Sequence, residues 1–179
     1  RTEHMFFEED RIMSVRKMIL TTDEGQKQEA IDELFPLQKN DFVSIFKLME
    51  GLPVTVRLLD PPLHEFLPHE TSSQKELASA LGLTLADIQK SVSQLSELNP
   101  MLGHRGCRLG ISFPELYKMQ VKAIILAALE VQAQGTEVNP EIMIPLIGDV
   151  NELTYLINEF RPEIDALIAS SGQSLNYQI

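Results

Sequence analysis

The chain has 179 residues, of which 44% are apolar, and its formal net charge is −11. A chain of this length can bury roughly two-thirds of the surface that it exposes when unfolded, so one domain with a sizeable core is expected. The excess of acidic residues repels the phosphates of nucleic acids and of anionic lipid surfaces. Neither nucleic acid nor membrane is therefore an expected partner.

The composition also bears on the compartment. The longest apolar run, Ala123–Leu129, has seven residues, whereas a membrane span needs about twenty. No signal-peptide stretch follows Arg1–His4, and Cys107, as a single cysteine, excludes an internal disulfide and a cysteine-based zinc cluster. We expect a cytoplasmic protein. The start at Arg1 and the strand-like end at 174–179 predict a piece of something longer.

The first fifty residues read as helices. Asp10 to about Leu20 carries apolar residues on one helical face. The same period continues from Asp23 to Met49, where Pro36 either splits the segment into two helices or kinks one.

A strand and a helical excursion follow. Leu52–Leu59 is β-branched and apolar and stops at prolines, which is typical of a short buried strand. Capping boxes are predicted at Ser73 and at Thr84, the second opening a helix that reaches Leu98. We expect residues 71–98 to be a helical insertion.

The second half alternates between strand and helix signals. In chain order the predicted elements are a strand at Cys107–Ile111, a helix from Ser112–Glu115 to about Ala133, a strand at Glu141–Ile147, a helix from Asp149 to about Ser170, and the start of a strand at Tyr177–Ile179.

This alternation predicts an α/β fold with parallel strands and helices outside. A doubly wound sheet and a (β/α)₈ TIM barrel both fit. Gly-rich nucleotide-binding turns do not follow any predicted strand, which favours the barrel. A complete barrel takes about 250 residues. With three or four strands, residues 1–179 are predicted to form a single domain that is a partial barrel, truncated at both ends.

Barrel active sites lie at the carboxyl ends of strands, where Arg57 and Asp60 fall. Arg57 stands inside an apolar run, so an anion is expected to meet it. A structural ion pair with a neighbouring carboxylate explains the same pattern.

Arg105 lies between two glycines just before a predicted strand. The glycines let the backbone approach a ligand, or they serve a loop that needs tight turns. Because arginines concentrate in Gly- and Pro-punctuated segments of an acidic chain, an anionic ligand is indicated. The histidines lack the spacing of a zinc helix, and Cys107 reads as a small buried residue.

Four segments of the chain form long, ordered motifs: Arg1–Phe7, Gly51–Pro68, Asn99–Gly110 and Pro140–Gly148. Through these segments the sequence closely resembles the pyruvate, phosphate dikinase family of phosphoenolpyruvate (PEP)-utilising enzymes. Residues 71–98 match least well.

The resemblance implies the C-terminal PEP-binding barrel of an enzyme that interconverts ATP, phosphate and pyruvate with AMP, pyrophosphate and PEP. Its phosphohistidine belongs to a separate domain, and the parent is expected to be a homo-oligomer. Matched by motif, Arg1, Arg57 and Arg105 resemble the arginines that hold the phosphoryl and carboxylate groups of PEP or pyruvate. Asp60 is expected to orient one of them.

In the family, the Mg²⁺ ligands and a catalytic cysteine come later in the chain than Ile179. The resemblance therefore implies no catalytic residue and no metal site in this segment, which is expected to be inactive alone. Three alternatives remain open: a PEP synthase or PEP-protein phosphotransferase, a self-associating piece with open sheet edges, and an acidic interaction module without a ligand.

Overall fold

The computed structural model describes residues 1–8, 10–96 and 99–179. In chain order its elements are α1 (Glu3–Phe6), α2 (Ile12–Leu20), α3 (Glu24–Leu48), β1 (Pro53–Arg57), η1 (Leu63–Phe66), α4 (Thr71–Leu81), α5 (Leu85–Leu95), η2 (Pro100–Leu102), α6 (Cys107–Ser112), α7 (Pro114–Ala133), β2 (Asn139–Met143) and α8 (Val150–Ser171).

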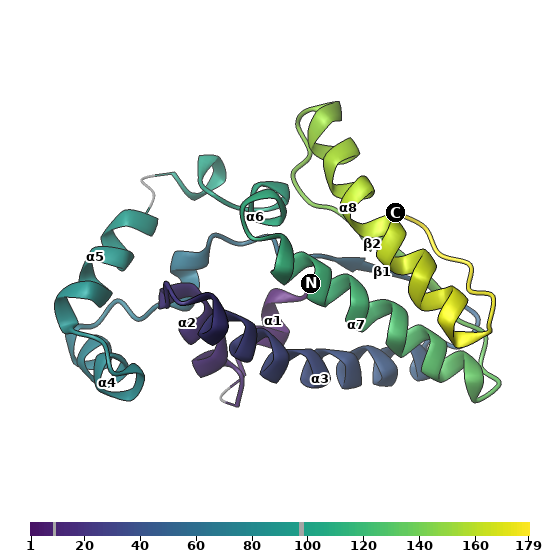
Figure 1. Ribbon diagram of the computed structural model, residues 1–179, viewed down its shortest axis with the longest axis horizontal. Coiled ribbons are helices and arrows are strands. Elements are labelled where there is room, and N and C mark those ends of the chain that lie inside the picture. Colours follow the sequence, from purple (N-terminus) through teal and green to yellow (C-terminus); the bar gives the residue numbers. More distant parts are fainter. Residues whose placement is uncertain (9, 97–98) are drawn as a thin grey trace.

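A small parallel sheet forms one layer and long helices form the other. β1 pairs with β2 in parallel, with Arg57 opposite Met143. On the other side of β2, Gln178 forms a parallel bridge with Glu141. Helices α3, α7 and α8 run side by side in Figure 1, with α7 between the other two. This arrangement confirms the mixed α/β class and the parallel strands.

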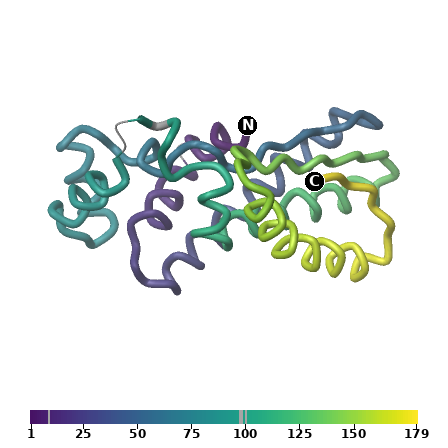
Figure 2. Tube along the Cα trace, turned by 90° about the horizontal axis from the view of Figure 1, so that it is seen from above, coloured from purple at the N-terminus to yellow at the C-terminus, as the bar shows by residue number. Residues whose placement is uncertain are grey.

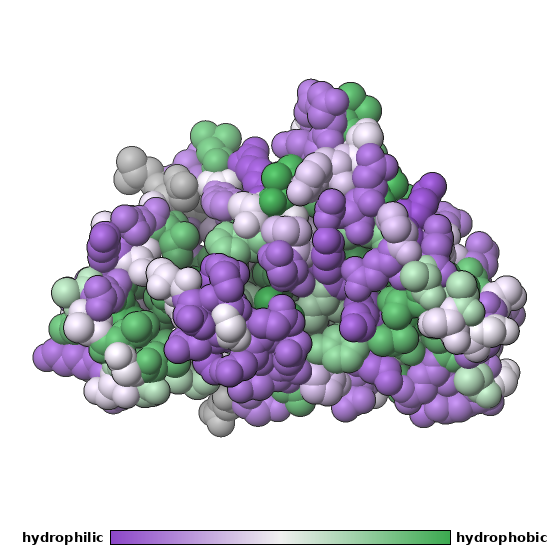
Figure 3. Space-filling model, viewed as in Figure 1, coloured by the Kyte–Doolittle hydropathy of each residue, from purple (hydrophilic) through white to green (hydrophobic). Residues whose placement is uncertain are grey.

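Helix α7 is the centre of the core. Its apolar side chains are buried along most of its length and pack with α3 on one side and α8 on the other. Pro114 occupies its first turn as predicted, although Phe113 rather than Ser112 is the N-cap. Charged groups lie mostly outside, and Figure 3 shows hydrophilic side chains over much of one face with smaller apolar areas between them.

Several predicted elements need correction. Cys107–Ile111 is a helical turn, not a strand, because Gly106 turns the chain at φ +58° and the Phe113 amide then bonds to the Leu109 carbonyl. The predicted strand Glu141–Ile147 ends at Met143, since Pro145 follows and Leu146 takes a positive φ.

Strand number and the start of one helix also differ from expectation. Within the described ranges the sheet has two strands, and the predicted strand at Tyr177–Ile179 contributes a single bridge. Of the two alternatives for Pro36, the structure has the single helix, since α3 continues through this residue. Helix α4 begins at Thr71 with Glu70 as its N-cap and has no capping box at Ser73.

Helices α4 and α5 lie together at one end of the molecule (Figure 1; Figure 2). The capping box of Thr84 with Asp87 is present, but α5 ends at Leu95, and Leu98 falls outside the described residues. A separate apolar cluster lies beneath these helices, with Ile88 fully buried in it. The two helices thus share a small core with Leu20 of α2 and with Leu67.

None of the helices in the described part of the chain combines the length and apolar character that crossing a bilayer requires.

The backbone segment that lies between the carboxyl ends of β1 and β2 is tightly constrained at Gly106. A Cβ atom there would lie 2.6 Å from the Leu146 Cβ and 3.0 Å from the Pro145 carbonyl oxygen. Its amide donates to the Asp60 carbonyl at 2.9 Å, so the segment cannot move away freely.

Replacing Gly106 with alanine is expected to lower the free energy of unfolding by at least about 3 kcal/mol, since positive φ and steric overlap both oppose the new Cβ. Gly82→Ala is the matched control, because Gly82 has φ +67° with nothing within 4 Å. It should cost about 1 kcal/mol. Urea denaturation measures both. Equal losses for the two variants would contradict the steric argument.

Ile88→Ala is expected to remove about 2 to 5 kcal/mol from the local stability of α4 and α5, because it empties the centre of their small core. Hydrogen exchange should accelerate in these two helices while β1 and β2 keep their protection. Lys90→Ala, an exposed position on the same helix, is the control. Equal acceleration in the sheet would show that residues 71–98 are not a separate insertion.

Candidate functional site

The carboxyl ends of β1 and β2 are joined by the segment that carries Arg105. After β1 ends at Arg57, the Leu58 amide still donates to the Met143 carbonyl at 3.0 Å. The amide of Gly106 then donates to the Asp60 carbonyl, and that of Cys107 to the Pro145 carbonyl, each at 2.9 Å. The glycine-flanked loop therefore bridges both strand ends.

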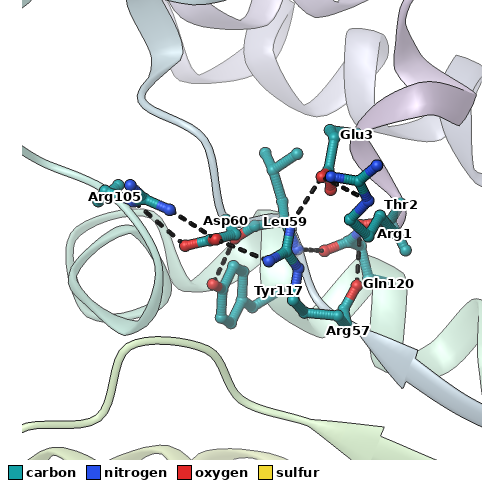
Figure 4. Close-up of polar contacts among 9 residues, drawn as sticks. All are labelled: Arg1, Thr2, Glu3, Arg57, Leu59, Asp60, Arg105, Tyr117 and Gln120. Carbon is teal, nitrogen blue, oxygen red and sulfur yellow. Dashed lines mark hydrogen bonds and ion pairs between the residues drawn. The ribbon is translucent and has the colours of Figure 1, made fainter. Parts of the chain in front are cut away.

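Asp60 holds two guanidinium groups at this edge (Figure 4). Its carboxylate Oδ2 lies 3.0 Å from Nη1 of Arg57 and 2.7 Å from Nη2 of Arg105. Arg105 also donates from Nε to Oδ1 at 3.3 Å, which makes its contact two-pronged. The Asp60 side chain is only 6% exposed, so the pairing offsets the cost of burying its charge.

Glu3 holds Arg57 from the other side. Its Oε1 accepts from Nη2 of Arg57 at 2.6 Å and lies 3.9 Å from Nε of Arg1. The Thr2 hydroxyl donates to the Arg57 carbonyl at 3.1 Å. The N-terminal turn is thus docked on the end of β1, with Glu3 8% and Arg1 65% exposed at their side chains.

The cluster carries one more positive than negative charge. Three guanidinium groups, those of Arg1, Arg57 and Arg105, share two carboxylates, those of Asp60 and Glu3. The Arg57 and Arg105 side chains keep 28% and 16% exposure. Guanidinium forks match the oxygens of phosphate and carboxylate groups. This arrangement can bind a small anion that bears such groups.

All four residues singled out from the sequence therefore belong to one network, across which Arg1, Arg57, Asp60 and Arg105 are linked. The ion pair considered as the alternative for Arg57 is present, and so is the tight turn considered for Arg105. The geometry therefore fits both interpretations of the arginines: binding of an anionic ligand, and a structural role in ion pairs and a tight turn.

Sequence reasoning missed the roles of four further residues. Glu3 and Thr2 stand next to Arg1 in the segment Arg1–Phe7, from which Arg1 alone was expected in the site. Tyr117 and Gln120, both fully buried on α7, bind the main chain of Leu59 through the Tyr117 hydroxyl and the Gln120 carbonyl oxygen. The available signal was two polar residues on the otherwise apolar, buried face of a helix.

Cys107 is a buried structural residue at this edge. It has no exposed surface, and its Sγ lies 3.2 Å from the Leu146 carbonyl oxygen. Burial, followed by the charge of Glu152, raises the pKa of the thiol, which therefore stays protonated. Across the described ranges, His, Cys, Asp and Glu do not gather in groups of three that fit a metal ion.

Comparisons with known proteins show the family to which the chain belongs. Residues 1–178 match the family model described as PEP-utilising enzyme, PEP-binding domain. The chain is 49% identical to pyruvate, phosphate dikinase of Clostridium symbiosum and 48% identical to pyruvate, phosphate dikinase of Rhizobium meliloti. It is 50% identical to the chloroplastic pyruvate, phosphate dikinase of Mesembryanthemum crystallinum. Each comparison covers the whole chain but 21%, 20% and 19% of the relative, respectively.

The chain thus spans about a fifth of the length of the curated relatives that it matches. Since the family model covers nearly every residue, the chain belongs to the PEP-utilising enzymes, in which it corresponds to the PEP-binding domain.

Proposed function

We propose that this chain is the PEP-binding segment of a pyruvate, phosphate dikinase. In this proposal Arg1, Arg57 and Arg105 bind the phosphoryl and carboxylate groups of PEP or pyruvate, and Asp60 orients two of the three forks. The observation that carries it is the Asp60 carboxylate, which holds Arg57 and Arg105 together at the carboxyl ends of parallel strands. Active sites of parallel α/β folds lie at this edge.

The fold proposed for the complete domain is a (β/α)₈ barrel. Support comes from the parallel order in which β1, β2 and Gln178 lie and from the long helices α7 and α8 that connect them. Residues 1–179 then supply part of the barrel wall, with 71–98 as an insertion.

The proposed chemistry needs positioning and charge neutralisation rather than a nucleophile from this chain. In phosphoryl transfer, negative charge spreads over the equatorial oxygens of the group in flight. The guanidinium groups of Arg57 and Arg105 each present several hydrogen-bond donors in a planar fork that matches phosphate and carboxylate oxygens. Because carboxylates already hold both forks, little reorganisation is needed when an anion arrives.

Other parts of the proposal concern the complete enzyme. A phosphohistidine on another domain supplies the phosphoryl group, Mg²⁺ supports the reaction, and the enzyme works as a cytoplasmic homo-oligomer. The described residues offer no cluster of metal ligands, so no step is assigned to the metal here. The segment alone is proposed to lack dikinase activity.

Arg57→Ala in the complete dikinase is expected to slow phosphoryl transfer to pyruvate by at least about 100-fold, since one charge-stabilising donor group is lost. ATP-driven phosphorylation of the histidine should stay within about twofold of the parent rate, because that step uses another site. Isotope transfer from labelled phosphoenzyme to pyruvate measures the first, and label incorporation from ATP measures the second. Arg161→Ala, at an exposed position on α8, is the control.

Loss of both half-reactions in Arg57→Ala, or of neither, would contradict the role given to this residue. Analysis of the reaction products separates the related enzymes. Pyrophosphate as a product identifies the phosphate dikinase, whereas inorganic phosphate identifies a PEP synthase, and transfer from PEP to a protein histidine identifies the phosphotransferase.

Self-association is the second candidate, favoured by one observation. Within the described ranges β1 pairs only with β2, so its other edge presents backbone donors and acceptors. Sedimentation at several concentrations tests this candidate, and a strictly monomeric chain at high concentration removes it.

A further inference from the structure

We propose that Tyr117 and Gln120 are positioning residues. They fix the main chain on both sides of Leu59, so that Asp60 holds the two arginine forks at the angle that phosphoryl transfer requires. This inference rests on the proposed function. It assigns a role in the reaction to two side chains of α7 that lie behind the anion-binding cluster.

The backbone after β1 is held from three directions. Leu58 is bound by β2 through the Met143 carbonyl, and Asp60 is bound by the Gly106 amide. Between them, Leu59 lies beyond the strand ladder and depends on side chains. Its carbonyl accepts from the Tyr117 hydroxyl at 2.5 Å, and its amide donates to Gln120 Oε1 at 2.9 Å (Figure 4).

Tyr117 also contacts the element that follows Arg105. Its ring packs so closely on α6 that a Cβ at Gly110 would lie 2.5 Å from the Tyr117 Cδ2 atom. One side chain thus touches the chain just after β1 by its hydroxyl and, by its ring, helix α6, which begins two residues after Arg105. Burial, followed by the charge of Asp60, raises the pKa of the Tyr117 phenol, so the hydroxyl remains a donor.

Gln120 supports the same conclusion. It has no exposed surface, and its Nε2 has no hydrogen-bond partner among the described residues. An amide buried in this way is unfavourable compared with an apolar side chain of the same size. Its carbonyl oxygen therefore has a specific task, which is to accept from the Leu59 amide.

The test uses Tyr117→Phe and Gln120→Met in the complete dikinase, because each removes one hydrogen bond and nearly preserves volume. Each is expected to lower kcat for pyruvate phosphorylation about tenfold or more, since geometric errors at a reacting group are costly. The KM for pyruvate should change by less than about threefold, and ATP-driven histidine phosphorylation by less than about twofold. Tyr155→Phe, an exposed tyrosine of α8, should match the parent.

Coupling to Asp60 separates positioning from general stability. If Tyr117 acts through Asp60, then Tyr117→Phe in an Asp60→Asn background should lower the remaining rate by less than about twofold. Multiplicative losses, parallel losses in both half-reactions, or folded variants with parent-like kcat would each overturn the inference. Should Tyr117→Phe fail to fold, Gln120→Met is held to the same criteria.

The outcome for the proposed function is read from different variants. Full pyruvate phosphorylation in Arg57→Ala and Asp60→Asn would remove that function, whatever Tyr117 does. Strong loss in those two variants, with parent-like kinetics in Tyr117→Phe and Gln120→Met, would remove only the positioning roles.

Discussion

The buried carboxylate of Asp60 is the constraint on which the carboxyl edge of the sheet depends. An ionised group with so little exposure is stable only when opposite charges and hydrogen bonds surround it. Arg57 is the last residue of β1 and lies three positions before Asp60, whereas Arg105 comes from 45 positions later in the chain. Since both reach Oδ2, one atom fixes the relation between the strand end and a distant loop.

The structural and the functional interpretations of the arginines support each other. Glu3 and Asp60 are the neighbouring carboxylates that a purely structural account requires. They leave one positive charge in excess, and they hold the forks before any ligand arrives. A site organised in this way spends less binding energy on ordering its side chains, which favours stabilisation of the transition state.

Much of the fold was predictable from local patterns, and the error at Cys107–Ile111 has a long-range cause. The long helices α7 and α8 follow from apolar periodicity together with Pro114 in the first turn of α7 and the capping box of Asp149 in α8, all of which act within a few positions. The run Cys107–Ile111 is too short for its period to distinguish strand from helix. Its conformation is set by Gly106, whose neighbours Leu146 and Asp60 come from other parts of the chain.

The same distinction between local sequence signals and long-range contacts applies to the candidate site. Arg57, Asp60 and Arg105 are recognisable in the sequence because each is unusual for its surroundings: a cation in an apolar strand, an acid beside prolines, and a cation between glycines. Glu3 gives no such signal, since its partner Arg57 lies 54 positions away. Only the folded chain brings the two together.

Tyr117 and Gln120 extend this argument to the main chain. Their bonds to Leu59 span 58 and 61 positions. A backbone group that leaves the strand ladder inside a protein must find another partner. Here helix α7, which packs against the sheet, supplies both partners, one for the carbonyl and one for the amide. Tyr117 and Gln120, three positions apart on the buried face of α7, therefore mark the point at which the chain leaves β1 and places Asp60 in the anion-binding cluster.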